Sequence, residues 1–319
     1  MKHIFIINPS AGSEDSTALI QQQVGLYAAR HTDFDHLIYT TRSMGDATQW
    51  VDQWCLQHPG QPVRFYACGG DGTLNEVVSG AVGHPDCQIS CFPCGSGNDY
   101  IKYYGTLDDF TRLDRLIEGI PHPVDVMKID YPTADGSTAT RYSINICNFG
   151  FDAMVCKTGN DIRRTPIIGG RHSYTTGIIR SLFTSRSNYV RMSVDGQPFY
   201  DGYMLLCTLG NGRYNGGKYM CAPLSLNDDG LLEVNLFRRM SLARFASLVG
   251  DYSRGTHIHR PDAQRLMLYR QATTATIESH KPFWLVIDGE MLHASRYQVQ
   301  NLRHAVTFVS PRPTESSIQ

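Results

Sequence analysis

The sequence predicts an N-terminal α/β domain with a parallel sheet, followed by a mainly antiparallel β-sandwich domain. Three observations lead to this prediction. A chain of 319 residues is long enough for two domains. Strand and helix signals alternate up to residue 125, and strand-like stretches with few helices follow them. We therefore expect domains at residues 1–125 and 126–302, with the tail 303–319 either returning to the first domain or finishing the second.

The expected strands of the first domain are short apolar runs that end at turn residues. They are His3–Ile7, Leu37–Thr40, Val63–Cys68 and Gln88–Phe92. Apolar residues recur at helical spacing over residues 47–54, 74–81 and 110–117. Ligands of parallel sheets bind at the carboxyl ends of the strands. We therefore expect the loops after these strands to meet at one edge.

Strand-like stretches separated by Asp-Gly turns dominate the second domain. They are Val124–Tyr131, Arg141–Phe149, Tyr189–Val194, Tyr203–Leu209, Leu231–Phe237, Ala272–Glu278 and Pro282–Ile287. Two helices are expected among them, one over Ser173–Ser185 and one that starts at Ser241. The strand Ala305–Val309 is compatible with either domain.

Composition limits the classes of function. Lys and Arg number 29 and Asp and Glu number 30, which excludes a nucleic-acid binder held by its overall charge. Apolar runs are too short for a membrane-spanning helix, and the N-terminal run is too short for a signal peptide. Nine scattered cysteines are typical of a reduced protein, so a cytoplasmic location is expected. The pair Cys91 and Cys94 is interpreted as core thiols near a turn.

Three small-residue loops carry the strongest functional signal. Gly69–Thr73 reads GGDGT between a strand and a helix, where glycines let backbone N–H groups approach an anion and the helix N-terminus favours negative charge. Asn8–Gly12 and Pro93–Asp99 follow two other strands. The alternative for each loop is ordinary turn chemistry. Three such loops at one predicted edge favour a nucleotide phosphate site.

These motifs, in this order and spacing, resemble the diacylglycerol kinase catalytic-domain family. Among its members, the chain is most similar to bacterial soluble lipid kinases, relatives of sphingosine and ceramide kinases. The matching segments of the first domain are INPSAG, GGDGTLNEVVSG and PCGSGNDY. The second domain matches at Gly217-Lys218, Ala222-Pro223, Leu226–Val234 and Asp288–Glu290. The resemblance thus covers most of the chain and implies the two-domain fold of diacylglycerol and NAD kinases.

The resemblance implies that ATP binds to the first domain. The matching positions are Asn8, Pro9, Ser10, Gly12, Thr41, Gly69, Gly70, Asp71, Gly72, Thr73, Asn75, Gly95 and Ser96. The third loop departs from the family pattern Gly-Thr-x-Asn-Asp, because Ser96 and Gly97 stand after Gly95. Ser96 keeps the hydroxyl, so the departure concerns nucleotide affinity more than activity.

The resemblance also implies a magnesium-dependent phosphoryl transfer from ATP to a lipid hydroxyl, such as that of diacylglycerol, in a cleft between the domains. Glu290 would accept the proton of the hydroxyl, as such chemistry requires. A structural Mg²⁺ would be held by Asp229 and by the backbone carbonyls of Leu226 and Leu231. Asp71 is the candidate for a catalytic Mg²⁺. Without the resemblance, the segments around Asp229 and Glu290 are ordinary turns.

A basic stretch, Lys157–Arg191, includes an apolar stripe and predicts transient contact with an anionic membrane surface. The alternative is a helix packed on its own domain. The substrate partner would be a lipid at that surface, and a homodimer through edge strands is compatible with the sequence. His257 and His259 lie two residues apart, which suits one strand face, but nothing nearby completes a metal site.

Two other functions compete with the lipid kinase. NAD kinases share the GGDGT loop and the two-domain plan, but typically have Asp-Gly-Gln where this chain has Asp288-Gly289-Glu290. A nucleotide- or lipid-binding regulator without turnover is the other alternative. Glu290 and Asp229 are both present, which favours an active enzyme.

Overall fold

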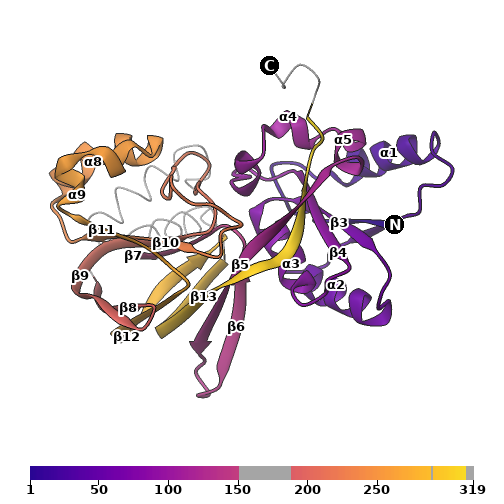
Figure 1. Ribbon diagram of the computed structural model, residues 1–319. Helices are drawn as coiled ribbons and strands as arrows, with labels where there is room; N and C mark the ends of the chain where they lie inside the picture. The colour runs from indigo at the N-terminus through magenta and orange to yellow at the C-terminus, as the bar shows by residue number, and fades with distance from the viewer. Residues whose placement is uncertain (151–187, 289, 314–319) are drawn as a thin grey trace, which may run out of the picture. The chain divides into compact units, whose positions relative to one another are not determined.

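The computed structural model describes residues 1–150, 188–288 and 290–313 (Figure 1). The chain divides into two units. Unit 1 comprises Met1–Val126 and Arg303–Gln319, and unit 2 comprises Met127–Leu302. The chain passes from one unit to the other within two strands, β5 (Ile120–Pro132) and β13 (Glu290–Ser310).

A parallel sheet forms the centre of unit 1. Its strands are β1 (Lys2–Ile7), β2 (His36–Thr40), β3 (Val63–Gly69) and β4 (Cys87–Pro93), in the order β2, β1, β3, β4. β3 is buried along its whole length, as expected of a central parallel strand. The end of β13 pairs with β4 in the parallel sense, with Thr307 opposite Gln88. The last strand of the chain therefore extends the sheet of unit 1.

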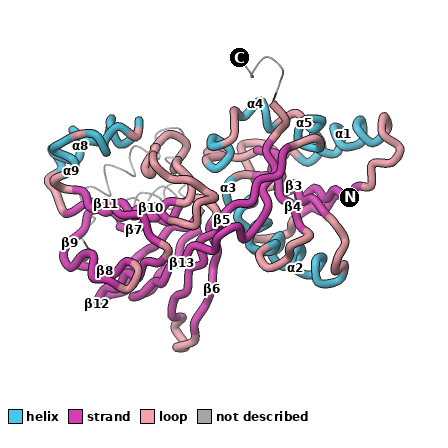
Figure 2. The backbone as a smooth tube through the Cα atoms, viewed as in Figure 1, coloured by secondary structure: helices cyan, strands magenta, loops and turns pink. Residues whose placement is uncertain are grey.

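Helices cover both faces of this sheet (Figure 2). α1 (Thr17–Ala28) lies on one face with α5 (Leu113–Ile117), while α2 (Asp46–Gln57) and α3 (Asp71–Ala81) pack together on the other. η1 (Tyr100–Tyr103) is a short 3₁₀-helix, and α4 (Leu107–Phe110) follows it. The prediction of one helix over 110–117 is wrong, because Arg112 has an extended backbone that separates α4 from α5.

Unit 2 is built from antiparallel strands, which confirms the predicted class of the second domain. Besides β5 and β13 they are β6 (Thr138–Ser143), β7 (Ile146–Gly150), β8 (Asn188–Val194), β9 (Gln197–Gly210), β10 (Leu232–Arg238), β11 (Met267–Ala272) and β12 (Thr274–Ile287). The strand order is β11, β10, β9, β7, β12, β13, and β8 pairs with both β9 and β12. Phe149, Leu285 and Tyr297 are among the fully buried side chains of its core.

Three predicted strands of unit 2 are divided or joined differently in the structure. The single strand expected over Arg141–Phe149 is two strands, β6 and β7, because the backbone between them turns towards the carboxylate of Asp288. The two strands expected over Ala272–Glu278 and Pro282–Ile287 are one strand, β12. Its pairing with β13 shifts register between Glu278 and Phe283, which explains the break in the apolar pattern.

α8 (Leu242–Arg254) begins where the sequence predicts, since the Ser241 hydroxyl accepts a hydrogen bond from the N–H of Arg244 at 3.3 Å. η2 (Thr256–His259) and α9 (Pro261–Gln264) follow it. The helix expected over Ser173–Ser185 and residues 157–187 of the basic stretch lie outside the described residues. No helix in the described part of the chain has the length and hydropathy needed to cross a bilayer.

Candidate functional site

The GGDGT segment forms a tight connection between β3 and α3. Gly69 ends β3 and Asp71 begins α3, with Gly70 between them in an extended conformation. A Cβ on Gly69 would overlap the side chain of Thr73, so only glycine allows the helix to start this close to the strand. The N-terminus of α3, including Gly72, is thereby placed at the carboxyl end of the sheet, where backbone N–H groups favour an anion.

The third loop lies directly against this segment. The N–H of Cys94 donates to the carbonyl of Gly69 at 2.8 Å. A Cβ on Gly95 would be 2.5 Å from the Cα of Gly70, so the two backbones touch only because both residues are glycines. The side-chain amide of Asn98 closes the loop by donating to the carbonyl of Gly95 at 2.7 Å. Ser96 is exposed in the middle of this loop.

The first loop completes the contact among the three. Asn8 Nδ2 donates to Thr73 Oγ1 at 3.0 Å, and Asn8 Oδ1 accepts the N–H of Ser10, also at 3.0 Å, across Pro9. Gly12 has a φ of 84°, and a Cβ there would overlap the carbonyl oxygen of Cys94. The three loops predicted to meet at one edge of the sheet therefore do so in unit 1.

Thr41 and Asn75 lie beside these loops. The N–H of Thr41 donates to the carbonyl of Ile7 at 2.8 Å, which holds the residue after β2 at the end of β1. Asn75 is 4% exposed, and its Oδ1 atom has no hydrogen-bond partner among the residues that the structure describes. Buried polar atoms normally have a partner, so this acceptor is suited to a ligand donor.

Asp71 connects the GGDGT segment to the third loop. Its Oδ1 atom accepts the N–H of Asp99 at 2.6 Å and that of Tyr100 at 3.4 Å. Burial, and next the charge of Asp99, raise the pKa of Asp71 to about 6, although the two N–H groups and Lys102 oppose the rise. A divalent cation bound at this pair of carboxylates would favour the ionised form of Asp71.

Lys102 is a residue that the sequence reasoning missed, because the loops themselves contain no lysine. Its Nζ atom lies 2.6 Å from Asp99 Oδ1, and the two residues are three apart at the start of η1. The structure thus brings one positive charge to the third loop. The i,i+3 spacing of Asp99 and Lys102 after Asn98 could have indicated this pair.

In unit 2, the carboxylate of Asp288 holds a loop between β6 and β7. It accepts the Ser143 hydroxyl at 2.9 Å and the backbone N–H groups of residues 144–146 at 3.0 to 3.4 Å. Asp288 is 8% exposed and has a φ of 42°, a left-handed conformation. This carboxylate is therefore fixed by the protein itself, and it has a structural role.

Glu290 has a different position in the same turn. It is the first residue of β13, pairs with Ile287 of β12 and is partly exposed. Its backbone belongs to β13, two residues after the buried Asp288. Such a group can accept a proton from a substrate that reaches this end of the strand.

The expected structural magnesium segment precedes β10. Asp229 Oδ1 accepts the N–H of Leu231 at 2.9 Å, and the side chain of Leu226 is 42% exposed. No group of three or more His, Cys, Asp or Glu side chains with metal-binding geometry occurs in the described ranges. A Mg²⁺ here would therefore rely on backbone carbonyls and water beside Asp229, which this ion accepts.

Glu233 supports the fit of a cation at this segment. It lies on β10, is 2% exposed, and its Oε2 atom lacks a hydrogen-bond partner within the described residues. Burial raises the pKa of Glu233, and the charge of Asp229 raises it further, against hydrogen bonds from Tyr269 and Gln271. A cation at this segment would offset the cost that burial places on an ionised Glu233.

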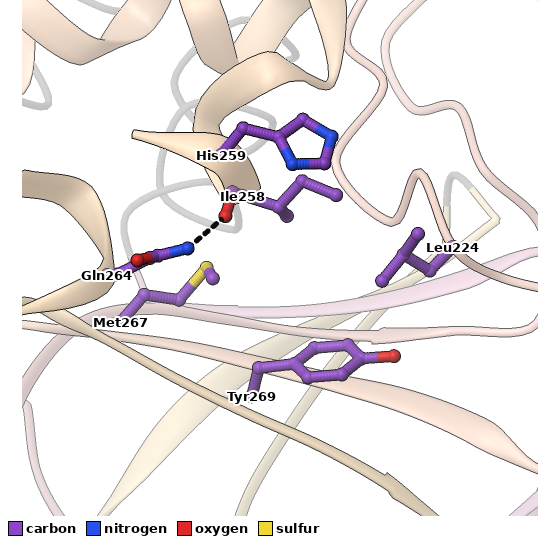
Figure 3. A pocket seen from close by; sticks show the side chains of 6 residues that line it. All are labelled: Leu224, Ile258, His259, Gln264, Met267 and Tyr269. Atoms are coloured by element: carbon purple, nitrogen blue, oxygen red, sulfur yellow. Dashed lines mark hydrogen bonds between the residues drawn. The ribbon is translucent and has the colours of Figure 1, made fainter. Parts of the chain in front are cut away.

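A pocket of about 380 Å³ opens in unit 2 near this segment. Figure 3 shows its six lining side chains, which are Leu224, Ile258, His259, Gln264, Met267 and Tyr269. The amide of Gln264 donates to the carbonyl of Ile258 at 2.8 Å, which leaves apolar side chains to form most of the wall. The residues come from a loop, η2, α9 and β11, so no single sequence motif could reveal the pocket.

The two histidines do not share a strand face as expected, because both lie in the 3₁₀-helix η2. His257 is fully buried beside Phe237 and Tyr252, and burial lowers its pKa to about 4. It is therefore a neutral core residue. His259 lines the pocket.

Comparison with known proteins matches nearly the whole chain. Residues 2–129 match the diacylglycerol kinase catalytic domain, and residues 145–310 match the YegS C-terminal NAD kinase beta sandwich-like domain. A diacylglycerol kinase of Staphylococcus carnosus (strain TM300) is 28% identical over 315 residues, which cover 98% of this chain and 96% of the relative. One of Staphylococcus aureus (strain JH9) is 28% identical over 290 residues, covering 89% and 84%.

Solved structures share the two-domain fold. A crystal structure of a diacylglycerol kinase from Bacillus anthracis has a TM-score of 0.69 at 22% identity and covers 97% of this chain and 96% of that one. Yeast NADH kinase, complexed with NADH, has a TM-score of 0.54 at 12% identity, covering 99% and 84%. From its two matching domains and its curated relatives, the chain belongs to the diacylglycerol kinase catalytic-domain family.

Proposed function

We propose that the protein transfers the γ-phosphoryl group of ATP to a hydroxyl group of a lipid such as diacylglycerol. The observation that carries the proposal is the contact of three small-residue loops at the carboxyl end of the parallel sheet. Glycines at positions 12, 70 and 95 let these backbones approach closely, and the N-terminus of α3 faces the same edge. This arrangement suits the phosphates of a nucleotide.

The nucleotide side of the proposal assigns one role to each group of residues. Backbone N–H groups of the loops, with the hydroxyls of Ser10, Thr73 and Ser96, bind phosphate oxygens. Thr41 and the buried Asn75 bind the rest of the nucleotide. Asp71 holds Mg²⁺ directly or through water. This ion, when bound, neutralises charge on the phosphates during transfer.

The lipid side of the proposal rests on unit 2. The acyl part of the lipid binds the pocket lined by Leu224, Met267 and Tyr269, whose apolar walls suit a hydrocarbon chain. Glu290 accepts the proton of the lipid hydroxyl as its oxygen forms a bond to the γ-phosphorus. The bond from that phosphorus to the bridging oxygen breaks, and ADP leaves with the electron pair. Asp229 and the backbone carbonyls of Leu226 and Leu231 would hold a second Mg²⁺, which would order the segment before β10.

A lipid substrate also implies contact with a membrane surface, and we include transient peripheral association in the proposal. The test is sedimentation of the protein with liposomes that contain or lack anionic lipid. Binding that requires the anionic lipid and weakens with salt supports the association. Equal recovery in the supernatant with both kinds of liposome would contradict it.

The activity test uses labelled ATP with separate diacylglycerol, sphingoid-base, phosphatidylglycerol and NAD substrates. We expect a labelled lipid product that requires Mg²⁺. Glu290→Gln should lower kcat by about 100-fold or more, since this is the usual loss when a general base is removed. Glu278→Gln is the matched control, because Glu278 is also partly exposed, lies on β12 and pairs with Arg296. A product with NAD alone would replace the lipid kinase by an NAD kinase.

A further inference from the structure

The N-terminus of α2 has no cap of its own. Its N-cap residue is Gly45, which has a φ of 81° and no side chain that could accept a hydrogen bond. The first N–H groups of a helix have no partner within the helix, and a Ser, Thr, Asp or Asn at the N-cap usually supplies one. The start of α2 therefore needs an acceptor from elsewhere in unit 1.

Glu76 of α3 supplies that acceptor. Its Oε1 atom accepts the N–H of Gly45 at 3.0 Å, and its Oε2 atom accepts the N–H of Ala47 at 3.2 Å. The two helices touch nearby, because the Thr48 hydroxyl donates to the backbone carbonyl of Glu76 at 2.9 Å. A carboxylate at this end of a helix also interacts favourably with the helix dipole. Glu76 is thus a cap provided by one helix to another.

Glu76 holds one end of the Thr41–Gly45 segment, at Gly45. The opposite end is held by the N–H of Thr41, which donates to the carbonyl of Ile7 at 2.8 Å. In the middle, Asp46 Oδ2 accepts the Tyr39 hydroxyl at 2.9 Å and the N–H of Arg42 at 2.8 Å. Gly45 can adopt many conformations when unsupported. The Glu76 contact fixes the end next to α2, together with the N–H of Asp46, which donates to the carbonyl of Ser43 at 3.3 Å.

Glu76 follows Asn75 directly in α3, so it belongs to the same rigid helix as the GGDGT segment. We propose that Glu76 is a positioning residue for nucleotide binding, which holds the Thr41–Gly45 segment in register with the Gly69–Asn75 segment. This inference rests on the proposed function, in which both segments contact ATP. The same carboxylate that caps α2 therefore sets the distance between two nucleotide contacts.

The test compares Glu76→Gln with Thr48→Val in the full chain. Glu76→Gln keeps the size of the side chain but replaces one acceptor oxygen by an amide that cannot accept from an N–H. Thr48→Val removes another hydrogen bond between the same helices and leaves the carboxylate in place. Both variants lose stability if the contacts only join α2 to α3. Nucleotide affinity distinguishes the two roles, because only a positioning role of Glu76 predicts that Glu76→Gln binds nucleotide more weakly than Thr48→Val.

We expect Glu76→Gln to raise the KM for ATP and the Kd of ATP, measured by calorimetry without lipid, by about tenfold. The KM for lipid and kcat at saturating ATP should stay within about twofold, because the variant changes only nucleotide binding. Amide hydrogen exchange over residues 42–47 should become faster. Thr48→Val should leave the Kd of ATP and this exchange unchanged.

Other outcomes overturn one proposal or the other. If the wild type does not bind ATP, the proposed function fails, whatever Glu76 does. If the wild type binds ATP and Glu76→Gln binds it equally well, the positioning role is wrong. An equal loss of ATP affinity in Glu76→Gln and Thr48→Val would also overturn it, since helix packing alone would then explain the effect. Thr41→Ala in the Glu76→Gln background should add little further loss if both act on one contact.

Discussion

Asp71 in unit 1 and Asp288 in unit 2 are both aspartates that precede a glycine, but their carboxylates have different partners. Asp288 accepts hydrogen bonds on both oxygens, from one hydroxyl and three backbone N–H groups of residues 143–146. Asp71 accepts only on Oδ1 in the bonds the structure shows, and the carboxylate of Asp99 lies nearby. The protein thus supplies donors to both oxygens of Asp288, while burial and a nearby like charge disfavour the ionised form of Asp71.

The difference shows how the same dipeptide serves two purposes. The protein supplies donors to Asp288, so its charge stabilises the loop between β6 and β7. At Asp71 burial and a like charge raise the pKa to about 6, which disfavours the ionised form. Because the ionised form of Asp71 is disfavoured, and because Asp71 lies where three loops suit phosphates, it is a candidate for binding a cation together with a nucleotide.

The largest expected effect on stability comes from removing the carboxylate of Asp288. Asp288→Ala leaves four buried donors without a partner, so we expect the free energy of unfolding to fall by roughly 4 kcal/mol. Urea denaturation followed by circular dichroism measures this loss. The change should also abolish activity, because the turn before Glu290 loses its support.

Asp195→Ala is the matched control for that change. Asp195 also precedes a glycine, has a φ of 48°, and accepts hydrogen bonds from Thr273 and Thr274, but it is exposed. Water replaces its lost bonds, so its loss should be about 1 kcal/mol. Equal losses in the two variants would show that burial does not distinguish Asp288 from an ordinary turn aspartate.

The sequence was sufficient for the parts of the fold that depend on local patterns. Strands of unit 1 could be found because each apolar run ends at a turn residue, and the loops that follow parallel strands must share an edge. The start of α8 could be found because Ser241 is a good N-cap. Local pattern was misleading at Arg112, where helical spacing continued across a break between α4 and α5.

The parts that the sequence could not reveal depend on contacts between distant residues. Ser143 and Asp288 are 145 positions apart, so nothing in the Asp-Gly-Glu triplet shows that its aspartate is structural. Likewise the acceptor for Gly45 is Glu76, which lies in another helix. The pocket around Tyr269 combines residues of one loop and three elements, η2, α9 and β11. Such features follow only from the folded chain.

A smaller effect is expected in the pH dependence of the free energy of unfolding, which tests the raised pKa of Asp71. The folded pKa of about 6 lies above the ordinary value of 3.8, so between these values the folded state binds more protons than the unfolded state. Stability due to this group therefore falls as pH rises from about 4 to about 6, by roughly 1–3 kcal/mol. Asp71→Asn should remove this dependence, and the difference between wild type and variant should be constant above pH 7.

Urea denaturation at several pH values measures the effect. The comparison is made as wild type minus variant, so that other titrating groups cancel. Parallel stability curves for the two proteins would mean that Asp71 has an ordinary pKa, and the contrast with Asp288 would lose its electrostatic basis. The same variant should lose Mg²⁺-dependent turnover if Asp71 holds the ion.

The smallest expected effect concerns the space beside Asp71. A Cβ on Gly97 would lie 2.9 Å from Asp71 Oδ2 and 3.4 Å from Asp99 Oδ2. Gly97→Ala therefore pushes on the carboxylate ends of two side chains, which can move, and stability should change by less than about 1 kcal/mol. We expect a threefold weaker affinity for magnesium-ATP, on the order of 0.6 kcal/mol, because the methyl group occupies space next to the proposed ion ligand.

Gly25→Ala in α1 is the control for Gly97→Ala, since a Cβ there meets nothing within 4 Å and alanine favours a helix. It should not alter nucleotide affinity. If Gly97→Ala binds magnesium-ATP as well as the wild type, then the room beside Asp71 is not used by the ion. The glycine after Ser96 would then be an ordinary loop residue. A cation at Asp71 would have to approach the carboxylate from the Oδ1 side, where the N–H groups of Asp99 and Tyr100 lie.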